Sequence, residues 1–221
     1  MRFFEIDTPE EWGDTERILK FGMTTHLPDI DGKLQLERCG PCIPPLSLSG
    51  LSDVVVTDAF RCVLERANLA QLQFQPVIKA HIVDFAWELI DFRSDATSYF
   101  PGEPEDTVLS LPHSPQIADR LGEVWQVMMD DGAVLESSGG DVSDLDVEAM
   151  MQWMMGNNPG YVPPTIWPIT HRVIASTWNG EHLFFGRIPK AGRFLLGTER
   201  AKDWLERHIG EWVQFRELEA I

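Results

Sequence analysis

Two stretches of the chain repeat the same order of apolar and polar positions. Residues 54–77 read VVVTDAFRCVLERANLAQLQFQPV, and residues 192–218 read GRFLLGTERAKDWLERHIGEWVQFREL. In both, a short apolar run precedes a threonine and an acidic residue. This pattern begins helices because the hydroxyl caps free amides and the acid faces the positive end of the helix. Asn68 or Gly210 then ends the helix, and an alternating run follows. Each stretch therefore predicts a strand, a helix and a second strand.

The two stretches align without a gap. We interpret them as two equivalent halves of one protein or as a duplicated element; a chance likeness of two amphipathic helices is the alternative. Two copies are too few for a solenoid, which stacks three or more units. Six aligned pairs are identical: Thr57 and Thr198, Leu64 and Leu205, Glu65 and Glu206, Arg66 and Arg207, Gln73 and Gln214, and Phe74 and Phe215.

Turn residues predict two hairpins elsewhere in the chain. Asp130-Asp131-Gly132 predicts one within residues 122–135, and Asn179-Gly180 predicts another within residues 173–188, because these dipeptides supply the positive φ angles of tight turns. A capping pattern at Ser143 opens a helix that runs through Met155. The proline-rich residues 94–121 are expected to form a long loop, and residues 26–45 look irregular.

These elements predict an α+β fold in which two related strand-helix-strand units pack with antiparallel hairpins, with an acidic insertion between them. We divide the chain into an N-terminal half (1–93), the insertion with its hairpin and Met-rich helix (94–165), and a C-terminal half (166–221). The three parts are expected to form one compact fold, since 221 residues with 43% hydrophobic content can bury a substantial core.

The formal charge of −17 is spread unevenly along the chain. Residues 1–93 hold 15 acidic and 9 basic residues, residues 94–171 hold 13 acidic residues and one basic residue, and residues 172–221 hold 7 and 8. Such an acidic middle third repels phosphate backbones and anionic membranes, so we expect no nucleic-acid or membrane partner. A basic protein partner is the natural complement.

The amino terminus and the cysteine content indicate a cytoplasmic protein. The opening residues MRFFEIDTPEEW lack the basic and apolar regions of a signal peptide, and no apolar run approaches the about 18 residues that span a bilayer. Three cysteines, an odd number, fit a reducing compartment better than a disulfide framework.

Cys39-Gly40-Pro41-Cys42 has the spacing of a thioredoxin active site, where the first thiol lies at a helix amino terminus. Here Ile43-Pro44-Pro45 follows at once, and proline cannot continue a helix from Cys42. A thiol-disulfide oxidoreductase that uses Cys39 and Cys42 is therefore an alternative function. A metal-stabilised adaptor is another, although the two thiolates would be only half of a tetrahedral zinc site. We expect no bound metal and no cofactor.

No hydrolase, metalloprotease or phosphate-loop motif is present, so we expect no enzyme and no catalytic residue. The acids of residues 141–148 alternate as in calcium loops but lack the glycine and the bidentate glutamate of those loops. We interpret them as a partner-facing surface joined to an adaptable Met-rich helix. The candidate partner-binding residues are Asp130, Asp131, Glu136, Asp141, Asp144, Asp146, Glu148, Met151, Trp153 and Met154.

The closing strings, residues 194–200 (FLLGTER) and 213–218 (VQFREL), resemble the carboxyl-terminal signature of the double-CxxCG motif immunity proteins of bacterial polymorphic toxin systems. Leu27-Pro28 ahead of the Cys39–Cys42 pair is similar to the opening of that family. The second CxxCG of the family has no counterpart here, and Ile43 follows Cys42 where the family has glycine. The resemblance implies an antitoxin that binds a cognate toxin domain and occludes its active site.

Overall fold

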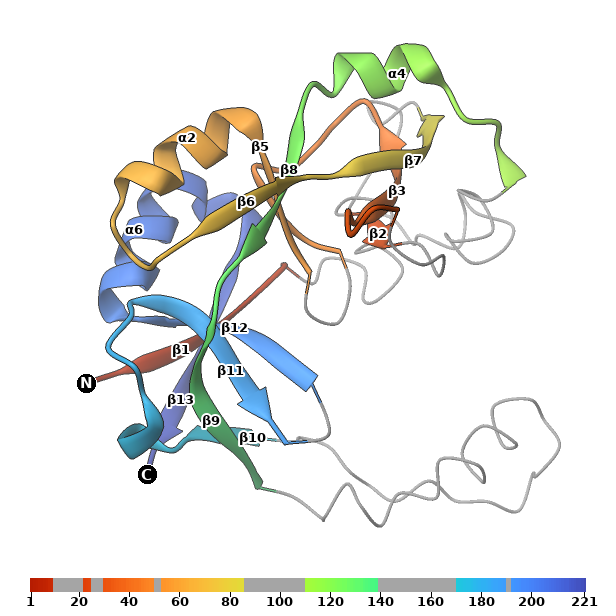
Figure 1. Ribbon diagram of the computed structural model, residues 1–221. Coiled ribbons are helices and arrows are strands. Elements are labelled where there is room, and N and C mark those ends of the chain that lie inside the picture. Colours follow the sequence, from red (N-terminus) through yellow and green to blue (C-terminus); the bar gives the residue numbers. More distant parts are fainter. Residues whose placement is uncertain (10–21, 25–29, 50–52, 86–109, 139–169, 190–191) are drawn as a thin grey trace, which may run out of the picture.

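The computed structural model (Figure 1) describes residues 1–9, 22–24, 30–49, 53–85, 110–138, 170–189 and 192–221. Strands and helices are both present, and sheet predominates, so the α+β class is consistent with the structure. The elements of the first half are β1 (Phe3–Asp7), β2 (Met23–Thr24), β3 (Gln35–Gly40), β4 (Leu46–Leu48), β5 (Val54–Thr57), α2 (Asp58–Arg66), β6 (Gln73–Pro76) and β7 (Ile78–Asp84). The later elements are α4 (Pro115–Arg120), β8 (Val124–Met128), β9 (Asp131–Ser138), β10 (Thr170–Val173), η4 (Ala175–Thr177), β11 (Leu183–Ile188), β12 (Gly192–Thr198), α6 (Glu199–Ile209), η5 (Gly210–Trp212) and β13 (Gln214–Ala220).

Six strands close into a barrel in the order β1-β12-β11-β9-β10-β13. Each strand contributes a buried apolar side chain to one cluster, because alternate residues of a strand point to the same face. The barrel is tight enough that a Cβ on Gly186 would lie 2.4 Å from Cδ1 of Leu196. The cluster comprises Phe3, Ala133, Leu135, Val173, Phe184, Leu196 and Leu218.

The other strands form two sheets, one of order β4-β5-β8-β6 and one of order β2-β3-β7. Leu36, Val55 and Val124 of these sheets form a smaller buried cluster with Leu34, which directly precedes β3. In Figure 1 these sheets lie above the barrel, and β8 leads directly down into β9. The sequence from β8 to β9 therefore connects the two parts of the molecule.

The two parts share a pairing pattern. β5 and β6 flank β8, and β12 and β13 flank β1, with every pair antiparallel. Thr57 pairs with Val124 and Gln73 with Met128, just as Thr198 pairs with Phe3 and Gln214 with Asp7. The gapless alignment of the two stretches thus coincides with the strand register, residue by residue.

The correspondence continues to the neighbouring strands. β4 is antiparallel to β5 as β11 is to β12, and β3 is parallel to β7 as β10 is to β13. β2 and β9 are likewise antiparallel to β3 and β10. β1, the first strand of the chain, lies in the barrel with the strands of the C-terminal half, and β8, which precedes the C-terminal half, lies in the sheet of the N-terminal half. We call this arrangement the strand exchange.

A third apolar cluster joins the halves. It contains residues from both helices and both sets of strands, and α2 and α6 lie side by side (Figure 1). Phe60 of α2 contacts Trp204 of α6, with ring centroids 5.9 Å apart. The helices begin differently, since Thr57 accepts a hydrogen bond from the Phe60 amide at 3.3 Å whereas the Thr198 hydroxyl contacts His182 Nδ1 at 2.9 Å. The predicted side-chain cap at Thr198 is wrong.

Both predicted hairpins are wrong. β8 and β9 lie in different sheets, and β10 pairs with β9 and β13 rather than with β11. The turn signals at Gly132 and Gly180 report only local backbone preference, and the pairing partners that bury each strand lie elsewhere in the sequence. The η4 helix after β10 turns the chain before β11, which pairs antiparallel with β12.

Two stretches expected to be irregular contain regular elements. β3 is a mostly buried strand within residues 26–45, and α4 lies within residues 94–121, where Ser114 accepts a hydrogen bond from the Ile117 amide at 3.4 Å. Within the expected insertion 94–165, residues 110–138 supply α4, β8 and β9, and these two strands pair with both halves. The predicted helix from Ser143 to Met155 lies outside the described residues.

Candidate functional site

The structure describes three of the ten predicted partner-binding residues: Asp130, Asp131 and Glu136. Asp130 lies between β8 and β9, and the other two lie on β9. The remaining residues, Asp141, Asp144, Asp146, Glu148, Met151, Trp153 and Met154, are outside the described part of the chain.

Asp131 faces the hairpin formed by β11 and β12. Its carboxylate lies 3.9 Å from Arg187 and 3.7 Å from Arg193. Arg193 also lies over the Phe185 ring, 4.6 Å from its centroid. The negative charge of Asp131 is therefore partly offset by two arginines from residues 172–221.

Glu136 is paired in the same way. Arg172 of the adjacent strand β10 donates a hydrogen bond to its carboxylate at 2.6 Å. Both side chains are partly exposed, so the pair contributes little to stability. The folded chain thus brings bases of the C-terminal third onto acids of the middle third. The role of Asp131 and Glu136 in binding a partner stays a prediction.

The other candidate acids lie in residues 139–169. This stretch contains Asp141, Asp144, Asp146 and Glu148 and no lysine or arginine. Its two ends are tied to neighbouring positions, because Ser138 at the end of β9 pairs with Thr170 at the start of β10. Residues 139–169 are therefore joined to the barrel at both ends beside the Ser138–Thr170 pair.

An ionic cluster that includes His171 lies next to the Ser138–Thr170 pair. Glu5 of β1 accepts a hydrogen bond from Arg216 of β13 at 2.6 Å, and His171 Nδ1 lies 3.2 Å from the same oxygen. Burial alone would raise the pKa of Glu5, but the hydrogen bonds to His171 and Arg216 and their charges outweigh it and hold this pKa below its usual range. The side chains of His171 and Glu5 are buried, whereas that of Arg216 is half exposed. Sequence reasoning missed this cluster, and the only signal was an acid inside the apolar run FFEID.

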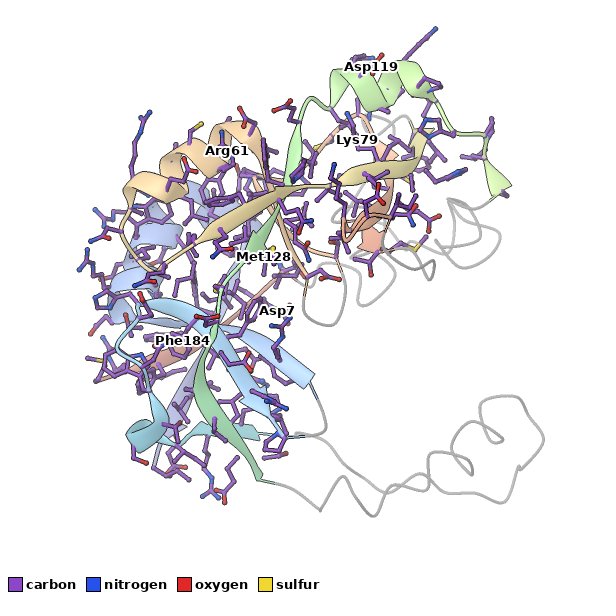
Figure 2. The ribbon with its side chains drawn as sticks, in the orientation of Figure 1. Asp7, Arg61, Lys79, Asp119, Met128 and Phe184 are labelled. Carbon is purple, nitrogen blue, oxygen red and sulfur yellow. The ribbon has the colours of Figure 1, made fainter. Side chains whose placement is uncertain are left out.

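A pocket of about 220 Å³ lies where connecting segments of the two halves meet. Asp130 lines it together with Glu181 and Gln71, and Leu183 and Phe184 at the start of β11 also border it. Figure 2 labels Phe184 on the barrel and Met128 on the strand that leads to the pocket. Sequence reasoning identified Asp130 but not Glu181 or Gln71, because the three come from separate loops.

The Cys39–Cys42 pair does not have the geometry of a redox site. Cys39 lies within the buried strand β3, one residue before its end, rather than at the start of a helix, and burial raises the pKa of its thiol to about 12. Arg38 is buried beside it and donates a hydrogen bond to the Cys42 carbonyl. A nucleophilic thiol needs the opposite shift, toward neutral pKa. The geometry therefore disfavours the oxidoreductase alternative.

Within the described residues, no group of three or more His, Cys, Asp or Glu side chains could hold a metal ion. Across the same part of the chain, none of the helices combines the length and the apolar character that crossing a membrane requires. A scan against protein-family models and searches of curated proteins and of solved structures found no match to this chain. The resemblance to immunity proteins stays a prediction.

Proposed function

We propose that this protein is a cytoplasmic antitoxin that binds the basic active-site cleft of a cognate toxin domain and occludes it without catalysing a reaction. One observation carries the proposal: residues 139–169 hold four acids and no base, and both ends of this stretch attach to one point of a closed barrel. A rigid scaffold that carries an unbalanced acidic segment suits the fast capture of a basic protein.

The charge balance elsewhere supports this assignment. Asp131 and Glu136 already face arginines of the same chain, so they offer little charge to a partner. The segment 139–169 also contains Met151, Trp153 and Met154, residue types that are enriched at interface centres or adapt to varied partners. Acids at the rim with apolar anchors among them match the composition of a binding hot spot.

We also infer that the two halves are related units of a duplicated domain. The six identical pairs of the alignment fall at corresponding positions of strand, helix and strand. The cation–π contacts agree as well: Arg61 lies over Trp125 and Phe74, and Lys202 lies over Phe4 and Phe215. In this view the duplicated units form the scaffold and 139–169 is an addition to one of them.

The proposal is tested with the toxin domain encoded beside the gene for this chain. Replacing Asp141, Asp144, Asp146 and Glu148 by their amides is expected to slow association about tenfold or more at low salt and to flatten its salt dependence, because charge steers the encounter. Stopped-flow mixing at several ionic strengths measures both. A matched control carries Asp131→Asn and Glu136→Gln and should associate at nearly the parent rate. Equal association rates for the parent chain and the fourfold variant would contradict the proposal.

A further inference from the structure

Two serines of the first half have buried hydroxyls without a hydrogen-bond partner among the described residues: Ser47 in β4 and Ser49 directly after this strand. Their exposed fractions are 1% and 2%. Pairing with β5 continues through Ser49, whose amide donates to the Asp53 carbonyl at 3.2 Å, so both side chains lie on one face of the strand. A hydroxyl that is taken out of water without a partner costs free energy. The two hydroxyls therefore indicate a ligand that hydrogen-bonds to both.

The face that carries these hydroxyls lines the interior of the first half. Ser47 pairs with Val55 of β5, and Val55 packs with Leu36 of β3 in the smaller buried cluster. Arg38 lies two residues after Leu36 and therefore points to the same face of β3. A Cβ on Gly22 would lie 3.1 Å from the Arg38 Cβ and 3.4 Å from Leu36 Cδ1, as expected if the two side chains share a face. Arg38 thus lies in the same interior as the two hydroxyls.

The short strand β2 lies between β3 and β4. It pairs antiparallel with β3, and the Thr24 amide donates to the Ser49 carbonyl at 2.6 Å. β3 and β4 are therefore two strand spacings apart, about 10 Å, a distance that the side chain of Arg38 and a small ligand can span together. Gly22, directly before β2 and beside Arg38, has no side chain to fill the space between them.

Arg38 supplies the positive charge of this interior. Its side chain is fully buried, and burial lowers its pKa to about 10, so the guanidinium is still charged at pH 7. It donates a hydrogen bond to the Cys42 carbonyl. A guanidinium has five donors in a planar fork, which can serve several acceptors and match the oxygens of an oxyanion. A buried cation near two hydroxyl donors has the chemistry of an anion site.

Asp53 carries the carboxylate that lies nearest to Ser49 in the sequence. Its Oδ1 accepts a hydrogen bond from Gln126 Nε2 at 3.2 Å. Gln126 belongs to β8, which flanks β5 on the side away from β4. The Asp53 carboxylate is therefore directed away from the two hydroxyls.

The barrel has different side chains at the equivalent positions. The strand register places Phe184 at the position of Ser47, and Gly186 at that of Ser49. Phe184 fills the barrel interior with an apolar ring, whereas Ser47 has only a hydroxymethyl group. The first half thus has less apolar volume and more hydrogen-bond donors in its interior, as a site for a polar ligand requires.

We propose that the interior of the first half binds a small tetrahedral oxyanion, of the class of inorganic phosphate and sulfate, between the Arg38 guanidinium and the hydroxyls of Ser47 and Ser49. The guanidinium and the two hydroxyls donate hydrogen bonds to separate oxygens of the anion. A tetrahedral oxyanion has enough oxygens for three donor groups, whereas a carboxylate has two. Because all three side chains are buried, the ligand is a free ion rather than the head group of a lipid or a nucleic acid. This inference goes beyond the antitoxin proposal and does not depend on it.

The test measures thermal unfolding of the full chain, dialysed into chloride, when inorganic phosphate replaces chloride at equal ionic strength. Millimolar phosphate is expected to raise the unfolding temperature by about 2–4 °C, because a ligand that binds only the folded state stabilises it. Sulfate should give a similar rise, and acetate a smaller one, because a carboxylate has too few oxygens for the three donor groups. No rise above the chloride control, or an equal rise with acetate, would overturn the proposal.

The double variant S47A/S49A distinguishes a ligand site from a structural role. In chloride it should unfold at or above the temperature of the parent chain, because removing a buried hydroxyl that has no partner removes a desolvation cost. In phosphate it should lose most of the rise that the parent chain shows. Ser137→Ala is the matched control and should keep the full rise, since the Ser137 hydroxyl is also buried without a partner among the described residues but lies on β9 of the barrel.

An equal phosphate-dependent rise in S47A/S49A and in the parent chain would overturn the proposal. A double variant that is less stable than the parent in chloride, with no effect of phosphate on either chain, would also overturn it, since internal water would then satisfy the hydroxyls. Toxin binding is a separate measurement. A failed phosphate titration therefore leaves the antitoxin proposal standing, and a failed toxin titration leaves the anion site standing.

Discussion

The two halves of this chain pair their strands in the same register, yet they fill their interiors with different side chains. The barrel encloses Phe3 and Phe184, where the first half has Val124 and Ser47 at the positions that the register makes equivalent. The C-terminal half therefore has the bulkier apolar interior. Its closed barrel is suited to support an added segment.

The halves also differ at one end of the sheet. Glu5 and Arg216 correspond to Gln126 and Gln75, so an ion pair in the second half replaces two neutral amides in the first. The connection between β2 and β3 is short, whereas residues 139–169 separate the corresponding strands β9 and β10. The shared pattern provides the scaffold, and the charged chemistry gathers where the halves diverge.

The largest expected difference between the halves concerns the exchanged strands. Phe3→Ala should lower the free energy of unfolding by about 3–5 kcal/mol, because a buried phenyl ring that contacts Trp178 and Phe184 leaves a cavity. Val124→Ala, at the equivalent position, should cost roughly 1–2 kcal/mol, since it removes only two methyl groups. Urea denaturation of both variants measures the difference. Equal losses would mean that the two interiors are equally packed.

The ionic cluster should give the second half a pH dependence of stability. Glu5→Gln is expected to destabilise the protein by roughly 1–3 kcal/mol at pH 7, because it removes a charge-assisted hydrogen bond. The pKa of Glu5 is held low in the folded state, so its contribution is present above the ordinary glutamate value of about 4.3 and is lost as the pH falls through the folded pKa.

Chemical denaturation of Glu5→Gln and of the parent chain between pH 3 and pH 8 checks this dependence. The two stabilities should converge toward the acidic end. Gln75→Leu, which alters the neutral equivalent of Arg216 and removes a hydrogen bond to the Gly32 carbonyl, should give a difference from the parent that stays constant over the same range. A difference for Glu5→Gln that does not depend on pH contradicts the ionic assignment.

The smallest expected effects concern the cations that lie over each exchanged strand. Lys202→Met should cost about 0.5–1 kcal/mol, because Lys202 lies 5.4 Å from the Phe215 ring centre. Arg61→Met should cost more, since Arg61 stacks closer, at 4.7 Å from the Trp125 ring, and pairs closely with both Asp58 and Glu65, whereas Lys202 has one close pair, with Glu206. Arg61 is labelled on α2 in Figure 2. Thermal unfolding of the two variants gives the order, and a larger loss for Lys202→Met would reverse it.

The individual helices and strands could be predicted from the sequence more readily than the pairing of the strands. The segments around α2 and α6 have strong start signals and periodic faces, and the structure has helices there with strands on either side. The pairing of β1 with β12 and β13 joins residues about two hundred positions apart, and no local signal specifies it. The Asp-Gly and Asn-Gly signals misled for the same reason.

The candidate site likewise has a part that the sequence predicted and a part that only the fold brings together. The acidic stretch was visible from composition, but the arginines that balance Asp131 and Glu136 became neighbours only through sheet formation. The pocket forms only where three separate connections meet, so no local pattern predicted that Glu181 lines it beside Asp130. A linear charge count overestimates the net negative charge at β9, because it omits the arginines that pair with Asp131 and Glu136.

The central claim, that an added acidic segment on a duplicated scaffold binds a basic toxin domain, is tested most directly by removing that segment. Ser138 and Thr170 pair with each other, so a short glycine-containing turn can replace residues 139–169 and join β9 to β10. The account predicts that this variant keeps the unfolding temperature of the parent chain and loses at least a hundredfold in affinity for the toxin domain in calorimetric titration. A folded variant that binds the toxin domain as tightly as the parent chain would contradict it.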